Sequence, residues 1–497
     1  MRYFYLPTML KITAVLTTKD MNKLFWAFVC STWVFVAHGQ QITISDELPI
    51  RTDLSYDIIG ELGGHVLLFR EESSRYSVQA FDPNMRSSWE KDIELDKRLV
   101  YKLGLTAADS NTFVLFYFYR ERGSTFVKAA RYDASANLRD SVLLTDLGFL
   151  FTTPEFEFVV SEDKSKTLLL YPEREGVFRA LAFDNPSMKV LWDVRFQDMD
   201  YNEVDDELHL LMDNQGGMHV VMEKDHFHSR RDRHRYELFR FSPGEADVKR
   251  YTIPIREKTT YDVAFAYDNL NRRLCGGGYY AEKNVERAEG YLALFVPEDA
   301  NQARLQFYPF AEDLIERVAG KEMRSNNPSL EEIEVRDLVL RRDGGLLIIG
   351  EETKNYYRRM TTVNRSMAFD NANRNIVDYF YDDVFVIAVH PDAKPHWSCV
   401  LHKKQYSQDD DGAYSSYFLF KTPAYLRLVF NDEVKLENTV SEYVLRGTGD
   451  YDRNSILSTE GLELRIRFRD AVQTSPQRIL VPSERRGRLR IARIDLL

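Results

Sequence analysis

The chain has 497 residues, more than one ordinary hydrophobic core accommodates, so either several domains or a repeat architecture is expected. Its 66 basic and 77 acidic side chains give a formal net charge of -11. This charge excludes a general affinity for nucleic acid or anionic lipid and leaves polyanion binding only to a local basic patch. Aromatic side chains make up 13%, including 28 Tyr and 31 Phe, which predicts strands rather than helices.

An export signal is predicted near the amino terminus. A lysine precedes an apolar run over residues 24–36, and two small residues follow at the positions that a signal peptidase reads. We therefore expect a signal peptide over 21–39, cleaved before Gln40, and interpret residues 1–20 as a gene-model extension or, alternatively, a short amphipathic stretch. No later run is apolar for long enough to span a bilayer, so we expect no transmembrane segment in the mature chain.

The chain contains three cysteines, of which Cys30 lies within the predicted signal peptide. Two remaining cysteines in a large exported chain do not form a disulfide framework. We expect Cys275 and Cys399 to be buried free thiols, with a single bridge between them as the alternative.

One pattern recurs along the rest of the chain: an alternating apolar strand, a turn rich in Asp, Pro, Asn and Gly, and a second strand. It first occurs as VQAFDPNMRSSWEKDI over residues 78–93. The turns are centred on Asp82, Asp133, Asp184, Ser242, Pro297 and Pro391. The intervals between these positions are 51, 51, 58, 55 and 94 residues, so the last interval predicts an insertion. Such turns between alternating strands indicate β-hairpins.

Each unit contains two further strands before this pattern. A polar turn and a strongly apolar strand come directly before it, as in GGHVLLFRE over 63–71. A weaker strand precedes them, as in EFEFVVSED over 155–163. Four antiparallel strands that recur every ~50 residues are typical of the blades of a β-propeller.

The predicted fold is therefore all-β, a single propeller of eight four-stranded blades over residues 40–497, with seven blades as the alternative. The first seven blades are expected near 55–95, 99–147, 154–198, 203–255, 261–310, 333–403 and 413–468. The carboxyl-terminal remainder supplies three strands of the eighth blade, and the segment 41–50 would add the fourth. Pairing the two ends in this way closes the ring and removes exposed sheet edges.

Two segments interrupt the repeat. Residues 310–332 contain Leu314, Ile315 and Val318 at helical spacing and predict one short helix. Residues 353–378 are polar and show no clear strand pattern. Because long ordered loops often carry function, the irregular sixth unit is the first place where a binding site is expected.

The turns AFDPNMRSSW, AFDNPSMKVLW and AVHPDAKPHW resemble the repeats of PQQ-like propellers. In that family a Trp after the turn packs between blades, and the matching residues are Trp89, Trp192 and Trp397. Over most of the mature chain the sequence also resembles uncharacterised exported propellers of Bacteroidota, through DNLNRRLCGGGYY and RDGGLLIIGEE. The first resemblance implies either a quinone-dependent enzyme or an eight-bladed scaffold subunit of outer-membrane assembly machinery. The enzymes carry adjacent cysteines beside the cofactor and this chain does not, so we expect the scaffold and no cofactor.

The segment EKDHFHSRRDRHRY over 223–236 is a candidate metal site. His226 and His228 alternate and would share one face of a strand, and His234 would approach them across the hairpin. Transition metals accept such imidazoles. The alternatives are a solvated hairpin tip and a basic loop that binds a partner's carboxylates.

A second candidate metal site is the segment GDYDRNS, in which Asp450, Asp452 and Asn454 match the first half of a calcium loop. The glycine expected at the sixth position of such a loop is Ser455, and the glutamate expected at the twelfth is Gly461. Calcium binding is therefore one interpretation of this segment, and an ordinary turn is the other.

An aromatic and basic cluster marks the start of the second interruption, formed by Tyr356, Tyr357, Arg358 and Arg359. Aromatic side chains beside Arg bind sugars and form the hot spots of protein interfaces. We therefore predict that a ligand or partner binds there. The neighbouring residues 379–385 are better explained as a buried strand of the same blade.

We recognise no catalytic pattern and interpret the chain as a non-catalytic exported propeller. We expect it to bind a protein of the bacterial envelope or cell surface, in the periplasm or at the outer membrane, and not to bind nucleic acid. A glycan-binding or glycan-processing propeller is the alternative.

Overall fold

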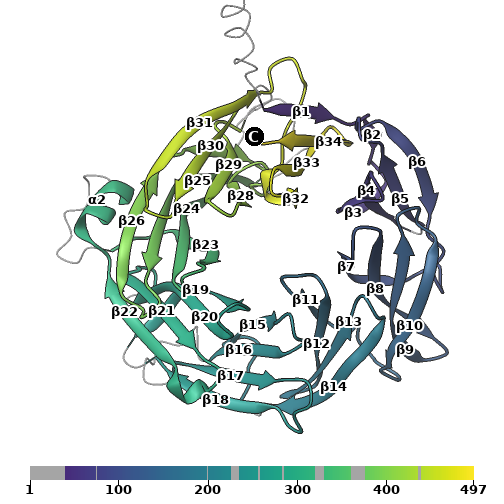
Figure 1. Ribbon diagram of the computed structural model, residues 1–497, viewed down its shortest axis with the longest axis horizontal. Helices are drawn as coiled ribbons and strands as arrows, with labels where there is room; N and C mark the ends of the chain where they lie inside the picture. Colours follow the sequence, from purple (N-terminus) through teal and green to yellow (C-terminus); the bar gives the residue numbers. More distant parts are fainter. Residues whose placement is uncertain are drawn as a thin grey trace, which may run out of the picture.

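The strands form eight antiparallel sheets, which stand around a central channel (Figure 1). The computed structural model describes residues 40–496 except 74, 199, 225–233, 256–257, 283–284, 320–328, 360–374 and 435–437. Within each blade the first strand lies at the channel and the last at the perimeter. The predicted eight-bladed propeller is confirmed, and the alternative of seven blades is wrong. The predicted signal peptide lies outside the described residues.

The strands of each blade follow one another in chain order. Blades 1 to 4 are β3 (Asp53–Leu62), β4 (His65–Glu72), β5 (Arg75–Phe81), β6 (Ser87–Asp92); β7 (Tyr101–Ala107), β8 (Thr112–Glu121), β9 (Ser124–Asp133), β10 (Leu138–Asp146); β11 (Glu157–Val160), β12 (Lys166–Arg174), β13 (Val177–Asp184), β14 (Lys189–Gln197); and β15 (Glu207–Met212), β16 (Met218–Lys224), β17 (Arg235–Phe241), β18 (Lys249–Pro254). Blades 5 to 7 are β19 (Thr259–Asp268), β20 (Arg273–Ala281), β21 (Gly290–Val296), β22 (Arg304–Pro309); β23 (Ile333–Leu340), β24 (Leu346–Arg359), β25 (Asn375–Val389), β26 (Pro395–Leu401), with β27 (Gln405–Gln408) added; and β28 (Tyr417–Lys421), β29 (Tyr425–Asn431), β30 (Thr439–Arg446), β31 (Tyr451–Ser458).

The eighth blade joins the two ends of the chain. It consists of β32 (Val472–Ser475), β33 (Arg478–Arg485), β34 (Arg488–Asp495) and β1 (Gln41–Ile44), and the short β2 (Leu48–Pro49) also pairs with β34. In the antiparallel register of β1 and β34, Gln41 lies opposite Asp495. The predicted closure of the ring by the amino-terminal strand is therefore confirmed, and β1 covers the edge that β34 would otherwise expose.

The cores lie between neighbouring blades. One hydrophobic cluster joins Phe69 and Val78 of blade 1 to Leu115 and Tyr117 of blade 2. The middle strands are buried on both faces, as in β16, where all seven residues are buried, whereas the outer strand β6 has no fully buried residue. Strands that are apolar on both faces therefore occupy the middle of each sheet, and alternating or polar strands form the perimeter.

The recurrent Asp turns have a direct structural cause. The Oδ1 of Asp82 accepts hydrogen bonds from the backbone N–H groups of Asn84 and Arg86, both at 2.8 Å, and so closes the turn before β6. The Trp residues that follow these turns pack between blades, as the resemblance implied. Trp192 donates from Nε1 to the carbonyl of Gly216 in blade 4 at 2.7 Å. Trp397 donates to the carbonyl of Gly447 in blade 7 at 3.1 Å, and Trp89 packs against the cluster between blades 1 and 2.

The two interruptions differ in outcome. The predicted helix is present as α2 (Glu312–Ala319), which buries Leu314 and Ile315 against blades 5 and 6. The interpretation of 353–378 as a segment without strands is wrong at both its ends, because β24 continues to Arg359 and β25 begins at Asn375. Pairing between β24, β25 and β27 supplies the hydrogen bonds of this hairpin, so it needs no alternating apolar pattern. Two 3-10 turns, η1 (Ala300–Gln302) and η3 (Phe468–Asp470), complete the described elements.

Cys275 and Cys399 are buried free thiols, as expected. Burial is the main reason that the pKa of each thiol is raised to about 12. Of the helices in the described part of the chain, none is long and apolar enough to cross a bilayer.

The strand order distinguishes the two faces of the ring. One face carries the turns between the second and third strands of each blade and the segments that link successive blades; we call it the loop face. The other carries the turns between first and second and between third and fourth strands; we call it the turn face. Most of the long connections, including the 353–378 hairpin, belong to the loop face.

Candidate functional site

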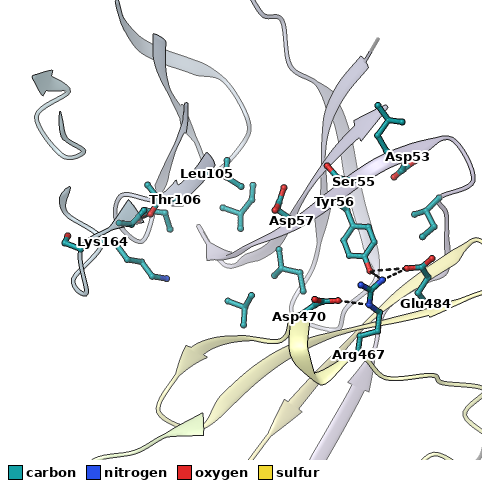
Figure 2. Close-up of a pocket in the computed structure, with 18 of the residues that line it drawn as sticks. Asp53, Ser55, Tyr56, Asp57, Leu105, Thr106, Lys164, Arg467, Asp470 and Glu484 are labelled. Carbon is teal, nitrogen blue, oxygen red and sulfur yellow. Dashed lines mark hydrogen bonds and ion pairs between the residues drawn. The ribbon is translucent and has the colours of Figure 1, made fainter. Parts of the chain in front are cut away.

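A cavity of about 850 Å³ lies in the channel between blades 8, 1, 2 and 3 (Figure 2). Its walls are β3, the ends of β7 and β11, and the segment that leads from blade 7 into β32. All these elements are first strands of blades or connect to them, so the propeller itself places their side chains at the channel. The lining residues, all within the described part of the chain, include no histidine or cysteine.

One wall of the cavity is organised by Arg467. Its Nε lies 2.6 Å from Oδ2 of Asp470, and its Nη1 lies 2.7 Å from Oε2 of Glu484. The hydroxyl of Tyr56 is 3.4 Å from the same Nη1, and Figure 2 shows the three partners converging on the guanidinium. Burial raises the pKa of Tyr56, so this phenol stays protonated and can donate a hydrogen bond. Burial alone would lower the pKa of Arg467, but its acidic neighbours hold it above the ordinary value.

The carboxylates of β3 are paired in the same way. Asp53 accepts two hydrogen bonds from Arg70, at 2.8 and 2.9 Å, and both side chains are buried. Asp57 lies 2.5 Å from the Nζ of Lys102. The hydrogen bonds with Asp53 are the main reason that the pKa of Arg70 is raised. These acids are therefore acceptors already engaged by cations, an arrangement that suits the binding of a polar group better than proton transfer.

The opposite wall of the cavity contributes an exposed lysine. Lys164 occupies the turn after β11, in a left-handed conformation with φ 61°, and Figure 2 places it across the cavity from Tyr56 and Arg467. Its ammonium is exposed and has no ion-pair partner among the residues that the structure describes. An acidic or hydrogen-bond-accepting group that enters the channel would meet Lys164 on one side and the Tyr56 hydroxyl on the other.

Exposed apolar side chains are distributed unequally between the two faces. Within the described ranges, the loop face has ten exposed large apolar side chains, either in its connections or at the strand ends beside them. They are Leu54, Leu99, Tyr101, Phe149, Phe151, Val204, Val285, Tyr356, Tyr357 and Tyr406. By the same criterion the turn face has five, which are Leu138, Val190, Leu191, Leu270 and Tyr451, and Leu143 lies within the outer strand β10. Phe151 is 92% exposed, and its ring contacts that of Phe149 edge to face at 4.9 Å. The loop face therefore exposes twice as many large apolar side chains as the turn face.

The predicted aromatic and basic cluster lies at the tip of the blade 6 hairpin, on this face. Tyr356 and Tyr357 are 48% and 79% exposed, as expected for a binding surface. Because side chains alternate along a strand, the structure places Tyr356 and Arg358 on one face of β24 and Tyr357 on the other. Arg359 ends the strand opposite Asn375. The cluster is therefore divided between two faces and does not form one platform.

Arg358 is held by neighbours that sequence reasoning did not identify. Its Nη2 donates to Oδ1 of Asp378 at 2.6 Å, and the same oxygen accepts from the Tyr406 hydroxyl at 2.7 Å. The ring of Phe380 lies between those of Tyr356 and Tyr406, at 5.7 and 5.1 Å. The hydrogen bond from Arg358 is the main reason that the pKa of Asp378 is lowered. Arg358 is therefore part of a polar and aromatic network on one face of the hairpin and is not a free arginine.

The predicted histidine site falls mainly on residues 225–233. His226 and His228 lie outside the described residues, and His234, just before β17, is buried. The metal prediction for these three residues is untested and stays a prediction.

A cluster with metal-binding chemistry lies at the base of the same loop and was not predicted. Ligand atoms of Glu207, His209 and Glu223 lie within 4.8 Å of one another. Glu207 and His209 alternate on β15, and Glu223 lies directly opposite Glu207 on β16, so all three share one face of the sheet. In the sequence, the pattern Glu-x-His at the start of an innermost strand could have indicated this cluster. Its significance depends on the strand register, which the sequence alone does not reveal.

The predicted calcium residues lie at the start of β31. Asp450 is in the preceding turn and accepts a hydrogen bond from Thr448 at 2.9 Å. Asp452 forms an ion pair with Arg446, and Asn454 donates to Glu442 at 3.4 Å. The structure thus gives each of the three oxygen-bearing side chains a protein partner of its own, and calcium binding stays a prediction.

Comparison with known proteins gives similarity of fold alone. No protein-family model matches the chain, and no curated protein matches its sequence. Among solved structures, the WD40 domain of SCAP from fission yeast is similar over 92% of this chain and 94% of its own, with 9% identity and a TM-score of 0.40. BamB from Moraxella catarrhalis is similar over 91% and 99%, with 11% identity and a TM-score of 0.37. Porphyromonas gingivalis dipeptidyl peptidase 4 is similar over 86% and 56%, with 10% identity and a TM-score of 0.46.

Proposed function

We propose that this protein is a non-catalytic, exported scaffold that binds another protein of the bacterial envelope through its loop face. The observation that carries the proposal is the asymmetry of exposed apolar side chains. Counted over the described residues, ten large ones lie in the connections or at the strand ends of the loop face, and five lie in those of the turn face. In the connections alone, outside the strands, the loop face holds five and the turn face holds Leu270. Apolar groups that stay exposed on one side of a soluble protein are typical of an interaction surface.

The chemistry of these side chains favours a protein partner. Six of the ten are aromatic, the residue class that dominates the buried centres of protein interfaces. Phe151, on the link between blades 2 and 3, has the most exposed aromatic ring in the described chain, and the ring of Phe149 lies beside it. The ion-paired lining of the central cavity supports the same proposal, because four of its five acids are held by cations, namely Asp53, Asp57, Asp470 and Glu484. Export to the envelope is supported by the signal-like segment before Gln40.

Paired variants test the proposal. The double change Phe149→Ser and Phe151→Ser removes the rings from the loop face, and Leu270→Ser removes a side chain that is 71% exposed on the turn face. Both should leave the melting temperature unchanged, because the replaced groups are largely solvated. After cross-linking in cells, we expect the wild type and Leu270→Ser to recover the same partner, and the double variant to lose it. Equal recovery by all three proteins, or recovery of no partner, would contradict the proposal.

A glycan is the second candidate ligand, favoured by the exposure of Tyr356 and Tyr357 beside Arg358. In this case the wild type binds to a glycan array, and Tyr356→Ala with Tyr357→Ala abolishes the signal. Tyr451→Ala, on an outer strand, is the matched control and should retain it. Retention on the array together with the absence of a protein partner would replace the scaffold proposal by this one.

A further inference from the structure

A groove lined by arginine lies at the blade 8 end of the loop face. It has a volume of about 300 Å³ and is formed by Arg51, Arg485, Arg486, Arg488 and Arg490 together with Glu47 and Glu463. Five guanidinium groups and two carboxylates leave three positive charges, in a chain whose net charge is -11. We call this surface the arginine groove. It is the local basic patch that the overall composition does not reveal.

Strand alternation explains why these side chains point outward together. Leu48 and Ile50 are buried in the core between blades 8 and 1, so the alternate residues Glu47 and Arg51 face the solvent. The other wall is the hairpin of β33 and β34, in which Arg485 lies opposite Arg488.

The turn of this hairpin brings the two walls together. Arg486 and Gly487 both have positive φ, 53° and 72°, as a two-residue hairpin turn requires. The backbone N–H of Ile50 donates to the carbonyl of Gly487 at 3.0 Å. A Cβ at position 487 would lie 2.8 Å from Cγ of Arg51, so glycine is what allows the Arg51 stem to lie against the turn. The fold therefore sets Arg51 beside Arg486.

Three arginines of the groove are partly neutralised and two are not. Arg490 and Arg488 both pair with Glu47, the former at 3.1 Å, and Arg485 lies 3.4 Å from Glu463. The hydrogen bond from Arg488 is the main reason that the pKa of Glu47 is lowered. Arg51 and Arg486 are exposed, and neither has an ion-pair partner among the described residues.

The groove also adjoins the central cavity. Ile50 and Glu484 line the cavity, whereas their chain neighbours Arg51 and Arg485 line the groove. A partner that covers the loop face near the channel therefore meets the two free guanidinium groups at its edge.

We propose that the arginine groove binds an acidic segment of the partner protein, an inference that rests on the loop face being the docking surface. Guanidinium groups pair with carboxylates through two parallel hydrogen bonds, and Arg is enriched at protein interfaces. Glu47 and Glu463 oppose the close approach of a compact dianion such as phosphate, whereas an extended segment distributes its carboxylates over Arg51 and Arg486. The negative charge of the whole chain opposes adsorption to an anionic membrane.

A defined probe tests the groove without knowledge of the partner. A fluorescein-labelled glutamate-rich peptide is titrated with the protein, and anisotropy is measured at physiological ionic strength. The double variant Arg51→Gln and Arg486→Gln removes the two unpaired charges. We expect its Kd to rise by at least about tenfold, since each change removes a charge-assisted hydrogen-bonding group.

Arg272→Gln is the matched control. Arg272 is exposed on the turn face, in a turn with φ 51°, close to the 53° of Arg486, so its replacement imposes the same backbone cost on the other side of the ring. It should leave the Kd of the peptide unchanged, and a glutamine-rich peptide should not bind the wild type. Equal affinity of the wild type and the double variant for the glutamate-rich peptide would overturn the proposal.

Further measurements separate this inference from the proposed scaffold. Inorganic phosphate and vesicles containing phosphatidylserine are titrated in the same way. The proposal would be overturned in favour of a phosphate or lipid site if the wild type binds phosphate or the vesicles but not the peptide, and if the double variant loses that binding. The arginine double variant can also be tested for recovery of the cross-linked partner. If it still recovers the partner that the variant with both Phe149→Ser and Phe151→Ser loses, the groove proposal fails while the scaffold proposal stands.

Discussion

Replacing Lys403 with Met tests the buried ion pair that joins blade 6 to blade 7. The Lys403 side chain is 1% exposed, and its Nζ lies 2.7 Å from Oε1 of the fully buried Glu351. Glu351 also accepts hydrogen bonds from Nε of Arg336 at 2.8 Å and from Oγ of Ser416 at 2.6 Å. Because Ser416 directly precedes β28 of blade 7, this carboxylate binds two neighbouring blades together.

Methionine retains much of the lysine volume but removes the ammonium group, so Glu351 would remain buried with one cation fewer. Breaking a buried pair from one side costs roughly 3–5 kcal/mol. Since Arg336 still contacts Glu351, we expect the lower end of this range, a loss of about 3 kcal/mol in the free energy of unfolding. Burial alone would raise the pKa of Glu351, but Lys403 and Arg336 hold it below its ordinary value. The stabilisation is therefore present at neutral pH and is lost as the pH falls through the folded-state pKa.

Urea denaturation followed by tryptophan fluorescence measures the loss. The control is Lys394→Met, which breaks an exposed ion pair with Asp392 and should leave the midpoint unchanged. The difference between the wild type and Lys403→Met should shrink as the pH is lowered, because protonation of Glu351 removes the unbalanced charge. A Lys403→Met variant as stable as the wild type at neutral pH would refute the reasoning.

Other outcomes follow from the turns, the thiols and the predicted segments. Gly487→Ala should lower the melting temperature more than Gly64→Ala does. Both glycines have a positive φ, which costs about 1–2 kcal/mol for a residue with a side chain. Only at position 487 would the added Cβ also clash with a neighbouring side chain, that of Arg51. In a protein that begins at Gln40, Cys275 and Cys399 should not react with a thiol reagent at pH 8 until the protein is denatured, because burial raises the pKa of both thiols to about 12. Rapid labelling of the native protein would contradict this expectation. Mass spectrometry of the exported protein should find Gln40 at its amino terminus, and retention of the preceding segment would refute the predicted signal peptide. Calcium added to chelator-treated protein should raise the melting temperature if the acidic turn before β31 binds it, and an unchanged value would remove that prediction.

The propeller was predictable from the sequence because the turns that recur along the chain are formed by residues close to one another in the sequence. Asp133, like Asp82, closes its turn through backbone hydrogen bonds, here from Ser135 at 2.9 Å and Asn137 at 2.8 Å. In blades 1 to 3 an aspartate at this turn recurs every 51 residues, and the strands on either side alternate visibly. Blade number, ring closure and the helix over 312–319 all follow from such short-range signals.

The candidate sites were less predictable because distant segments form them. Arg51 and Arg486 meet across Gly487, and no spacing rule connects positions near opposite ends of a chain. The cluster over 356–359 was adjacent in sequence, but strand alternation divided it between two faces. The apolar first part of that strand was predicted, but its continuation over 353–359 was missed, because pairing with β25 rather than burial stabilises these polar residues.

The seam between β1 and β34 gives the protein a particular order of assembly. Gln41 pairs with Asp495, so β1 gains its partner strand only after residues 488–495 have been made. Until then seven blades border an open gap, and apolar side chains such as Leu68 and Phe81, which blade 8 covers, lie at its edge. The ring therefore cannot close before β34 is made, and until then this apolar edge would lie open to solvent.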